Sequence, residues 1–145
     1  MEKILISACL VGDKVKYDGK SNYTPYIKDL LEKYELVPFC PEVEGGLPIP
    51  RTPCEIKNGK VINAEGKDCS KVFLLGAEKA YNICLYLGIN TVILKDNSPS
   101  CGNRHIYDGS FSHHLINGTG ITAKYLASKG IRVLSEEDIP FLLKE

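Results

Sequence analysis

Three features that would assign this chain of 145 residues to a familiar class of protein are missing. It carries no net charge, because eighteen basic residues balance eighteen acidic ones, which argues against a broad basic face for a long nucleic acid. No apolar run approaches the roughly 20 residues of a membrane span. The short apolar start lacks the longer core and cleavage site of a signal peptide, so we expect a cytoplasmic protein without a membrane partner.

The six cysteines also lack the spacings of common metal sites. None forms a C-x-x-C pair, so the usual zinc-finger and ferredoxin patterns are absent. Without an export signal, metal binding or thiol chemistry explains them better than a disulfide framework. Any metal site must therefore be assembled by the fold from distant segments.

Short apolar runs alternate with helical patterns along the chain. Strands are expected at 3–9, 36–39, 91–94 and 131–134, and helices at 25–34, 70–87 and 119–129, with Thr24, Ser70 and Ser135 as helix caps. Between the second and third strands, Asn58-Gly59 predicts a small hairpin in an excursion at 55–69. A long loop is expected at 95–117. This alternation predicts an α/β fold: one Rossmann-like domain over residues 1–145, with a short parallel sheet of about four strands flanked by helices.

Three cysteines fall at one edge of the predicted sheet. Cys9 ends the first strand, Cys40 ends the second, and Cys101 lies in the loop that leaves the third. Ligands of such folds bind beyond the carboxyl ends of the strands. Three thiolates in one cleft would repel one another, so the trio either binds a cation or stays protonated. Three protein ligands around a metal would leave a coordination position open. Zinc and an iron–sulfur cube both fit, and the spacing does not choose between them.

The other three cysteines are expected to be small buried apolar residues. Cys84 falls in the middle of the long helix, and Cys54 and Cys69 fall in the excursion between the second and third strands.

Six segments together resemble the thiouracil desulfidase family, in the family's order and over nearly the whole chain: ISACLVGDKVKYDG (6–19), CPEVEGGLPIPR (40–51), GKDCSKVFLLGA (66–77), LKDNSPSCG (94–102), IYDGSF (106–111) and GTGITAKYLASKGIRVLSE (118–136). The resemblance implies a 4Fe–4S cluster held by Cys9, Cys40 and Cys101, with one iron lacking a protein ligand. It also implies catalytic roles for Glu42 of the Cys-Pro-Glu motif and Ser98 of the Ser-Pro-Ser-Cys motif.

The same resemblance implies a non-redox, hydrolytic removal of sulfur from a thiolated pyrimidine. The substrate would be 2- or 4-thiouracil, or its nucleoside or nucleotide, and the products would be sulfide and the oxygen analogue. A soft thiocarbonyl sulfur suits iron, and a carboxylate such as Glu42 can take a proton from the attacking water.

Two other functions use the same three cysteines. One is a zinc-binding hydrolase or structural domain. The other is a non-enzymatic nucleotide- or sulfur-binding module, for example one that delivers thiolated bases during tRNA turnover. No feature of the sequence predicts an oligomeric state.

Several polar residues near these motifs also have plain structural interpretations. Ser98 either donates a hydrogen bond to the substrate or braces the turn before Pro99, and Ser100 is its alternative. Arg51 is expected to form a salt bridge with Glu44 or Glu55, although a substrate phosphate is another partner. The histidines are expected in loops or at the surface, and no metal-ligand spacing joins them: His105, His113 and His114.

Overall fold

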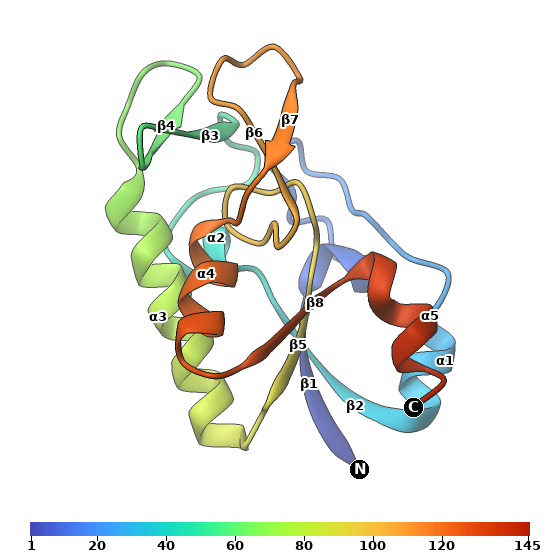
Figure 1. Ribbon diagram of the computed structural model, residues 1–145. Helices are drawn as coiled ribbons and strands as arrows, with labels where there is room; N and C mark the ends of the chain where they lie inside the picture. The colour runs from blue at the N-terminus through green and yellow to red at the C-terminus, as the bar shows by residue number, and fades with distance from the viewer.

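A four-stranded parallel sheet forms the centre of the molecule in the computed structural model, which describes all 145 residues (Figure 1). Its strands are β1 (Glu2–Ser7), β2 (Tyr34–Phe39), β5 (Thr91–Leu94) and β8 (Arg132–Ser135), in the spatial order β2-β1-β5-β8. Every neighbouring pair in this sheet is parallel, so the four carboxyl ends lie at one edge. The α/β prediction is confirmed.

Helices cover both faces of the sheet. On one side lie α3 (Ser70–Leu87) and α4 (Ile121–Ser128), and on the other lie α1 (Ile27–Lys33) and α5 (Ile139–Leu142) (Figure 1). Three shorter elements follow strand ends: the 3₁₀ turns η1 (Ala8–Val11) and η2 (Glu136–Asp138), and the four-residue helix α2 (Pro41–Glu44).

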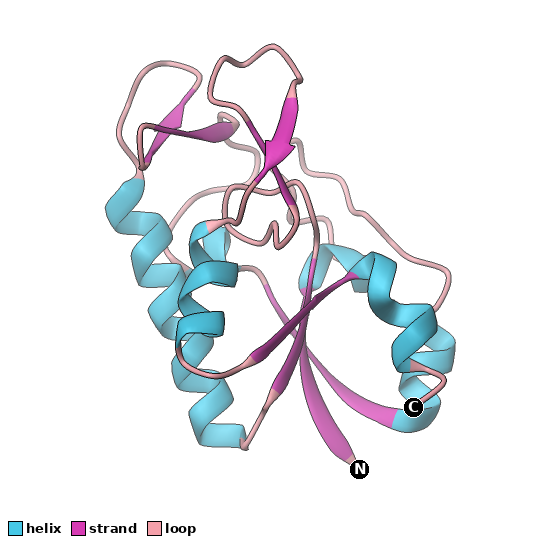
Figure 2. Cartoon of the chain, in the orientation of Figure 1, coloured by secondary structure: helices cyan, strands magenta, loops and turns pink.

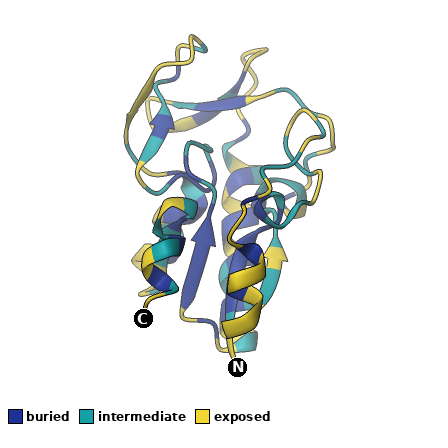
Figure 3. Ribbon diagram, turned by 90° about the vertical axis from the view of Figure 1, so that its right-hand side faces the viewer, coloured by how far each residue is buried: buried dark blue, intermediate teal, exposed yellow.

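The strands divide their apolar side chains between two core clusters. Leu5 of β1 packs with α3 and α4 residues, whereas Ile4 and Ile6 of the same strand pack against α1 and α5. Successive side chains of a strand point to opposite faces, which explains this division. The central strands are dark blue in Figure 3, the colour of buried residues, because helices cover them on both sides.

Two antiparallel hairpins stand above the carboxyl ends of the strands (Figure 2). The first joins β3 (Cys54–Lys57) to β4 (Lys60–Asn63), where Asn58-Gly59 predicts it. The second joins β6 (His105–Tyr107) to β7 (Leu115–Asn117). The prediction of 95–117 as a plain loop was wrong for β6 and β7, because strands of three residues are too short to show an alternation of apolar and polar side chains.

Two predicted helix starts differ from the structure. Ser70 is the first residue of α3 rather than its cap, and its Oγ accepts a hydrogen bond from the Val61 N–H of β4 at 2.9 Å. Thr24 lies outside α1, which begins at Ile27 without a side-chain cap. Tyr34 opens β2, paired with Glu2, and does not extend the helix.

The Ser135 cap is confirmed. Its Oγ accepts a hydrogen bond from the Glu137 N–H at 3.2 Å, at the start of η2. None of the helices combines the length and the hydropathy that crossing a membrane demands.

Candidate active site

A cavity of about 560 Å³ opens at the carboxyl ends of the strands, which is a typical volume for a small-molecule site. Its floor comes from the residues that follow β1, β2 and β5, and its upper walls come from the two hairpins. Short connections after parallel strands place side chains at this edge, where such folds bind their ligands.

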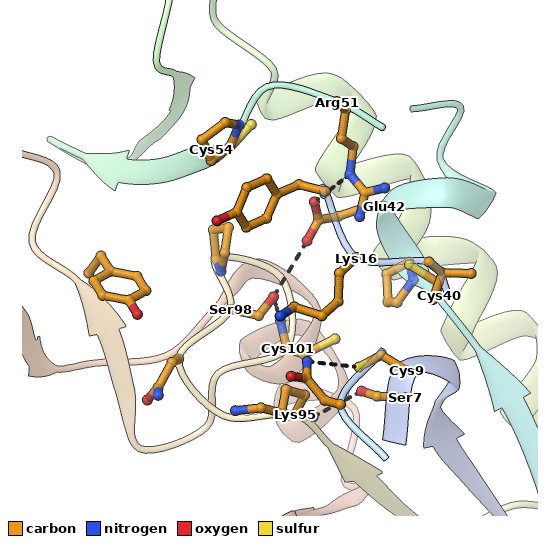
Figure 4. Close-up of a pocket in the computed structure, with 18 of the residues that line it drawn as sticks. Ser7, Cys9, Lys16, Cys40, Glu42, Arg51, Cys54, Lys95, Ser98 and Cys101 are labelled. Atoms are coloured by element: carbon orange, nitrogen blue, oxygen red, sulfur yellow. Dashed lines mark hydrogen bonds and ion pairs between the residues drawn. The ribbon is translucent and has the colours of Figure 1, made fainter. Parts of the chain in front are cut away.

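The three cysteines selected by the strand-end argument all line this cavity (Figure 4). Cys9 lies in η1, Cys40 is the N-terminal cap residue of α2, and Cys101 lies in the loop after β5. Cys84 is buried in α3 outside the cavity. Cys54 is buried as expected but also reaches the cavity wall, which its place in the excursion did not reveal.

Burial and mutual repulsion govern the ionisation of the three thiols. Desolvation is the main cause that raises the pKa of each of Cys9, Cys40 and Cys101. The charge of Cys40 further raises the pKa of the other two thiols. The hydrogen bond that Asn22 Nδ2 donates to Cys9 Sγ at 3.5 Å acts in the opposite direction and lowers the pKa of Cys9. Burial and mutual repulsion thus both disfavour the thiolate form of these three cysteines.

This donor set fits an iron–sulfur cluster in its chemistry. Three sulfur donors from sequence-distant segments face one cavity, and none is consumed in a disulfide. No three cysteine, histidine, aspartate or glutamate side chains converge closely enough to hold one metal ion. A 4Fe–4S cluster would bind each of the three cysteines through a different iron.

Glu42 projects from α2 into the same cavity and is held by two partners. Its Oε1 accepts a hydrogen bond from Arg51 Nε at 3.1 Å, and its Oε2 lies 3.5 Å from Ser98 Oγ (Figure 4). Burial raises the pKa of Glu42, although the Arg51 guanidinium and the Ser98 hydroxyl act in the opposite direction. The expectation that Arg51 pairs with Glu44 or Glu55 was wrong, because the folded segment 45–53 turns the guanidinium back onto Glu42.

Ser98 organises the loop that carries Cys101. Its Oγ accepts hydrogen bonds from the backbone N–H groups of Ser100 and Cys101, both at 3.1 Å. The hydroxyl proton is then free to point toward Glu42. Ser100 is fully buried and pairs with Thr122 Oγ1 at 2.8 Å, so its hydroxyl braces the start of α4.

Asp96 closes the base of this loop. Its Oδ1 accepts hydrogen bonds from the N–H groups of Arg104 and His105, and its Oδ2 lies 2.9 Å from His105 Nδ1. Burial opposes ionisation of this carboxyl, but the hydrogen bonds outweigh burial and lower its pKa. The loop that presents Ser98 and Cys101 is thus fixed at both ends.

The sequence did not assign a place in the site to several further cavity residues. Tyr107, Phe111 and His113 reach the cavity from the β6–β7 hairpin. Glu55 of β3 holds that hairpin in place, since its Oε1 accepts hydrogen bonds from the N–H groups of Gly109 and Phe111 at 3.0 and 3.1 Å. The IYDGSF motif was the available signal, but the contact with β3 depends on the fold.

The chain is similar to known proteins in both sequence and structure. A family model described as 2-thiouracil desulfurase matches residues 4–138. The chain belongs to this family of sulfur-removing enzymes. The chain is also 37% identical over 150 residues to the uncharacterized protein YbbK of Bacillus subtilis strain 168, with 97% of this chain and 99% of that protein covered.

A solved structure is similar over nearly its whole length. It is described as the [4Fe-4S]-dependent thiouracil desulfidase TudS, and it matches with a TM-score of 0.92 and 42% sequence identity. The match covers 98% of this chain and 95% of that one. The desulfurase family resemblance carried by the six segments is therefore confirmed in sequence and in fold.

Proposed function

We propose that this protein hydrolyses the carbon–sulfur bond of a thiolated pyrimidine. The thiocarbonyl compound and water would yield the oxygen analogue and hydrogen sulfide, with no net electron transfer. The observation that carries the proposal is the meeting of three thiols and a largely buried carboxylate, Glu42, in one cavity of a 2-thiouracil desulfurase family member. The likeness to a [4Fe-4S]-dependent thiouracil desulfidase supports the same reaction.

The proposed cofactor is a 4Fe–4S cluster bound by Cys9, Cys40 and Cys101. When bound, it would offer one iron without a protein ligand as a soft Lewis acid for the thiocarbonyl sulfur. The chain contributes the shape of the site around it. Cys9 in η1, Cys40 just before α2 and Cys101 in the loop after β5 would each contribute one thiol.

Glu42 is the proposed general base and acid. Its carboxylate would take a proton from the water that attacks the ring carbon, and would later return it to the leaving sulfur. Burial suits this exchange, because a raised pKa brings the carboxyl closer to the range in which it both accepts and releases a proton. Ser98, whose acceptor sites are filled by two backbone N–H groups, remains able to donate to the carboxylate or to the substrate.

The cavity favours a small substrate. Its volume of about 560 Å³ accommodates a base, a nucleoside or a nucleotide, and the zero net charge offers no broad surface for a long nucleic acid. We include 2-thiouracil and 4-thiouracil as free bases, together with their nucleosides and nucleotides, in the proposed substrate class.

The decisive experiment combines cluster content with turnover. We expect protein prepared without oxygen to contain about four iron atoms and four acid-labile sulfides per chain, as a 4Fe–4S centre requires. It should release sulfide from 2- or 4-thiouracil, and ¹⁸O from labelled water should enter the uracil formed. Zinc without iron, or binding of thiouracil without sulfide release, would contradict the proposal.

The Cys101→Ala and Cys84→Ala variants form a matched pair. We expect Cys101→Ala to lose cluster iron and sulfide release, because it removes one of three anchoring thiols. Cys84→Ala should retain both, with a stability loss of about 1 kcal/mol, because Cys84 packs in the core away from the cavity. Sulfide release at the normal rate by Cys101→Ala would refute the cluster assignment.

A further inference from the structure

Arg51 is buried beside the cavity more deeply than its charge alone would allow. Its side chain is 6% exposed, although it comes from the irregular segment 45–53. Burying a guanidinium is costly unless its donors are matched by acceptors. The matching acceptors are the Glu42 carboxylate and the Pro48 carbonyl, which Nη1 contacts at 3.3 Å.

The backbone of Arg51 is anchored as well. Its N–H donates to the Tyr17 carbonyl at 2.7 Å, which joins segment 45–53 to the loop that follows β1. The guanidinium is therefore held by its own backbone, by Pro48 and by Glu42. An arginine that only balanced a surface charge would need no such fixation.

Arg51 and Ser98 contact different oxygens of Glu42, and this arrangement indicates the role of Arg51. Arg51 occupies Oε1 of Glu42, and Ser98 lies at Oε2, so the carboxylate is held between a cation on one side and a hydroxyl on the other. Figure 4 shows Glu42 between these two partners, with Ser98 on the side of Cys101. Since the guanidinium is almost wholly covered, it offers little surface to a substrate phosphate.

We propose that Arg51 is a positioning residue, which fixes the orientation of the Glu42 carboxylate so that Oε2 faces the reacting water and substrate. This inference rests on the proposed function and adds to it a residue that acts only through Glu42. A lysine would not replace it fully, because an ammonium lacks the fixed planar geometry in which Nε contacts Glu42 while Nη1 contacts the Pro48 carbonyl.

The test uses the full chain carrying its cluster, prepared without oxygen. We expect Arg51→Gln to lower kcat for thiouracil desulfuration by about 10- to 100-fold, because small misplacements of a reacting group cost rates of this order. KM should stay within about twofold, and iron content and the visible spectrum should not change. The matched control is Arg132→Gln, which removes an exposed ion pair with Glu145 far from the cavity and should leave kcat unchanged.

Two further measurements separate positioning from a general structural effect. In a Glu42→Gln background, Arg51→Gln should cause no further loss of kcat, because the group it positions is already removed. Guanidinium ions should partly restore activity to Arg51→Ala, since the lost side chain leaves space next to a second cavity of about 290 Å³ that Arg51 also lines. A crystal structure of Arg51→Gln should show the Glu42 carboxylate rotated from its position.

Each contrary result overturns the assignment. A large rise in KM with kcat unchanged would make Arg51 a substrate-binding residue. Three results would show that Arg51 does not act by orienting this carboxylate. They are an equal loss of kcat on Arg51→Gln with and without Glu42, a loss of iron from the variant, and an unchanged Glu42 carboxylate in the variant structure. Absence of sulfide release from the unaltered protein would instead refute the proposed function, while the position of Glu42 in the variant structure would still test the orienting contact.

Discussion

At the scale of single residues, one hydroxyl and one carboxylate connect two segments that are far apart in sequence. Ser98 Oγ holds the backbone of the Cys101 loop and also lies 3.5 Å from Glu42 Oε2. The bracing contacts of Ser98 are present in the structure, and they are compatible with the proposed donating role. Its oxygen braces the turn, and its proton remains available to the carboxylate.

Replacing Glu42 tests the proton-transfer role directly. We expect Glu42→Gln to lower kcat by about 10²- to 10⁴-fold, the range in which a positioned general base contributes, because an amide accepts no proton at neutral pH. Stopped assays of sulfide release, with iron content measured on the same samples, provide the check. The control is Glu44→Gln, two residues further along α2 and exposed, which should retain normal turnover. Equal activity of the two variants would remove Glu42 from the mechanism.

At the scale of secondary-structure elements, the packing of α2 on α3 positions both Cys40 and Glu42. Gly76 of α3 lies directly under the first residue of α2, so that a Cβ at this position would stand 2.0 Å from the Pro41 carbonyl oxygen. No shift of a flexible side chain relieves such a clash, because the neighbour is backbone. The glycine is therefore required for the close approach of the two helices.

Gly76→Ala should consequently damage the site through its scaffold. We expect a loss of about 1–3 kcal/mol in the free energy of unfolding, as overpacking typically costs, together with reduced iron content as α2 is pushed outward. Urea unfolding and iron analysis measure the two effects. Glu78→Ala, at an exposed position of the same helix, should change neither. Full stability and full iron loading in Gly76→Ala would show that α2 can move without cost.

The elements differ in how well their sequence predicts them. The sequence correctly predicts the strand Thr91–Leu94 and the helix Ser70–Leu87, because burial imposes a clear apolar pattern on each. Strand Leu115–Asn117 is exposed throughout, so no pattern marks it. Ser70 looks like a cap but bonds to β4, because a neighbouring strand competes for its hydroxyl.

In the candidate site, too, some features follow from the sequence and others depend on the fold. That Cys9, Cys40 and Cys101 share an edge follows from parallel topology, since strand ends meet wherever strands run the same way. The pairing of Arg51 with Glu42 does not follow, because it depends on the path of the irregular residues 45–50 that lie between them. The wall contributed by Glu55, Phe111 and Tyr107 likewise requires the docking of one hairpin on the other.

At the scale of the whole molecule, the proposed cluster would join three parts of the chain that only the fold brings together. Cys9, Cys40 and Cys101 follow three adjacent strands, β1, β2 and β5. A ligand that binds the folded chain at three such points stabilises it by mass action, because the unfolded chain does not present the thiols in one place. Cofactor loading and global stability should therefore change together.

Removal of the cluster is expected to lower the melting temperature of the whole chain by about 10 °C or more. A ligand present at a thousandfold over its dissociation constant adds about 4 kcal/mol, and a chain of this length gains about 2–4 °C per kcal/mol. Anaerobic calorimetry of loaded and iron-depleted protein measures the difference. Cys101→Ala should melt at the temperature of the depleted protein whether or not iron and sulfide are supplied, whereas Cys84→Ala should still gain stability on loading. Identical melting of loaded and depleted protein would mean that the bound iron is not held by the three strand ends, because a group anchored there must resist their separation.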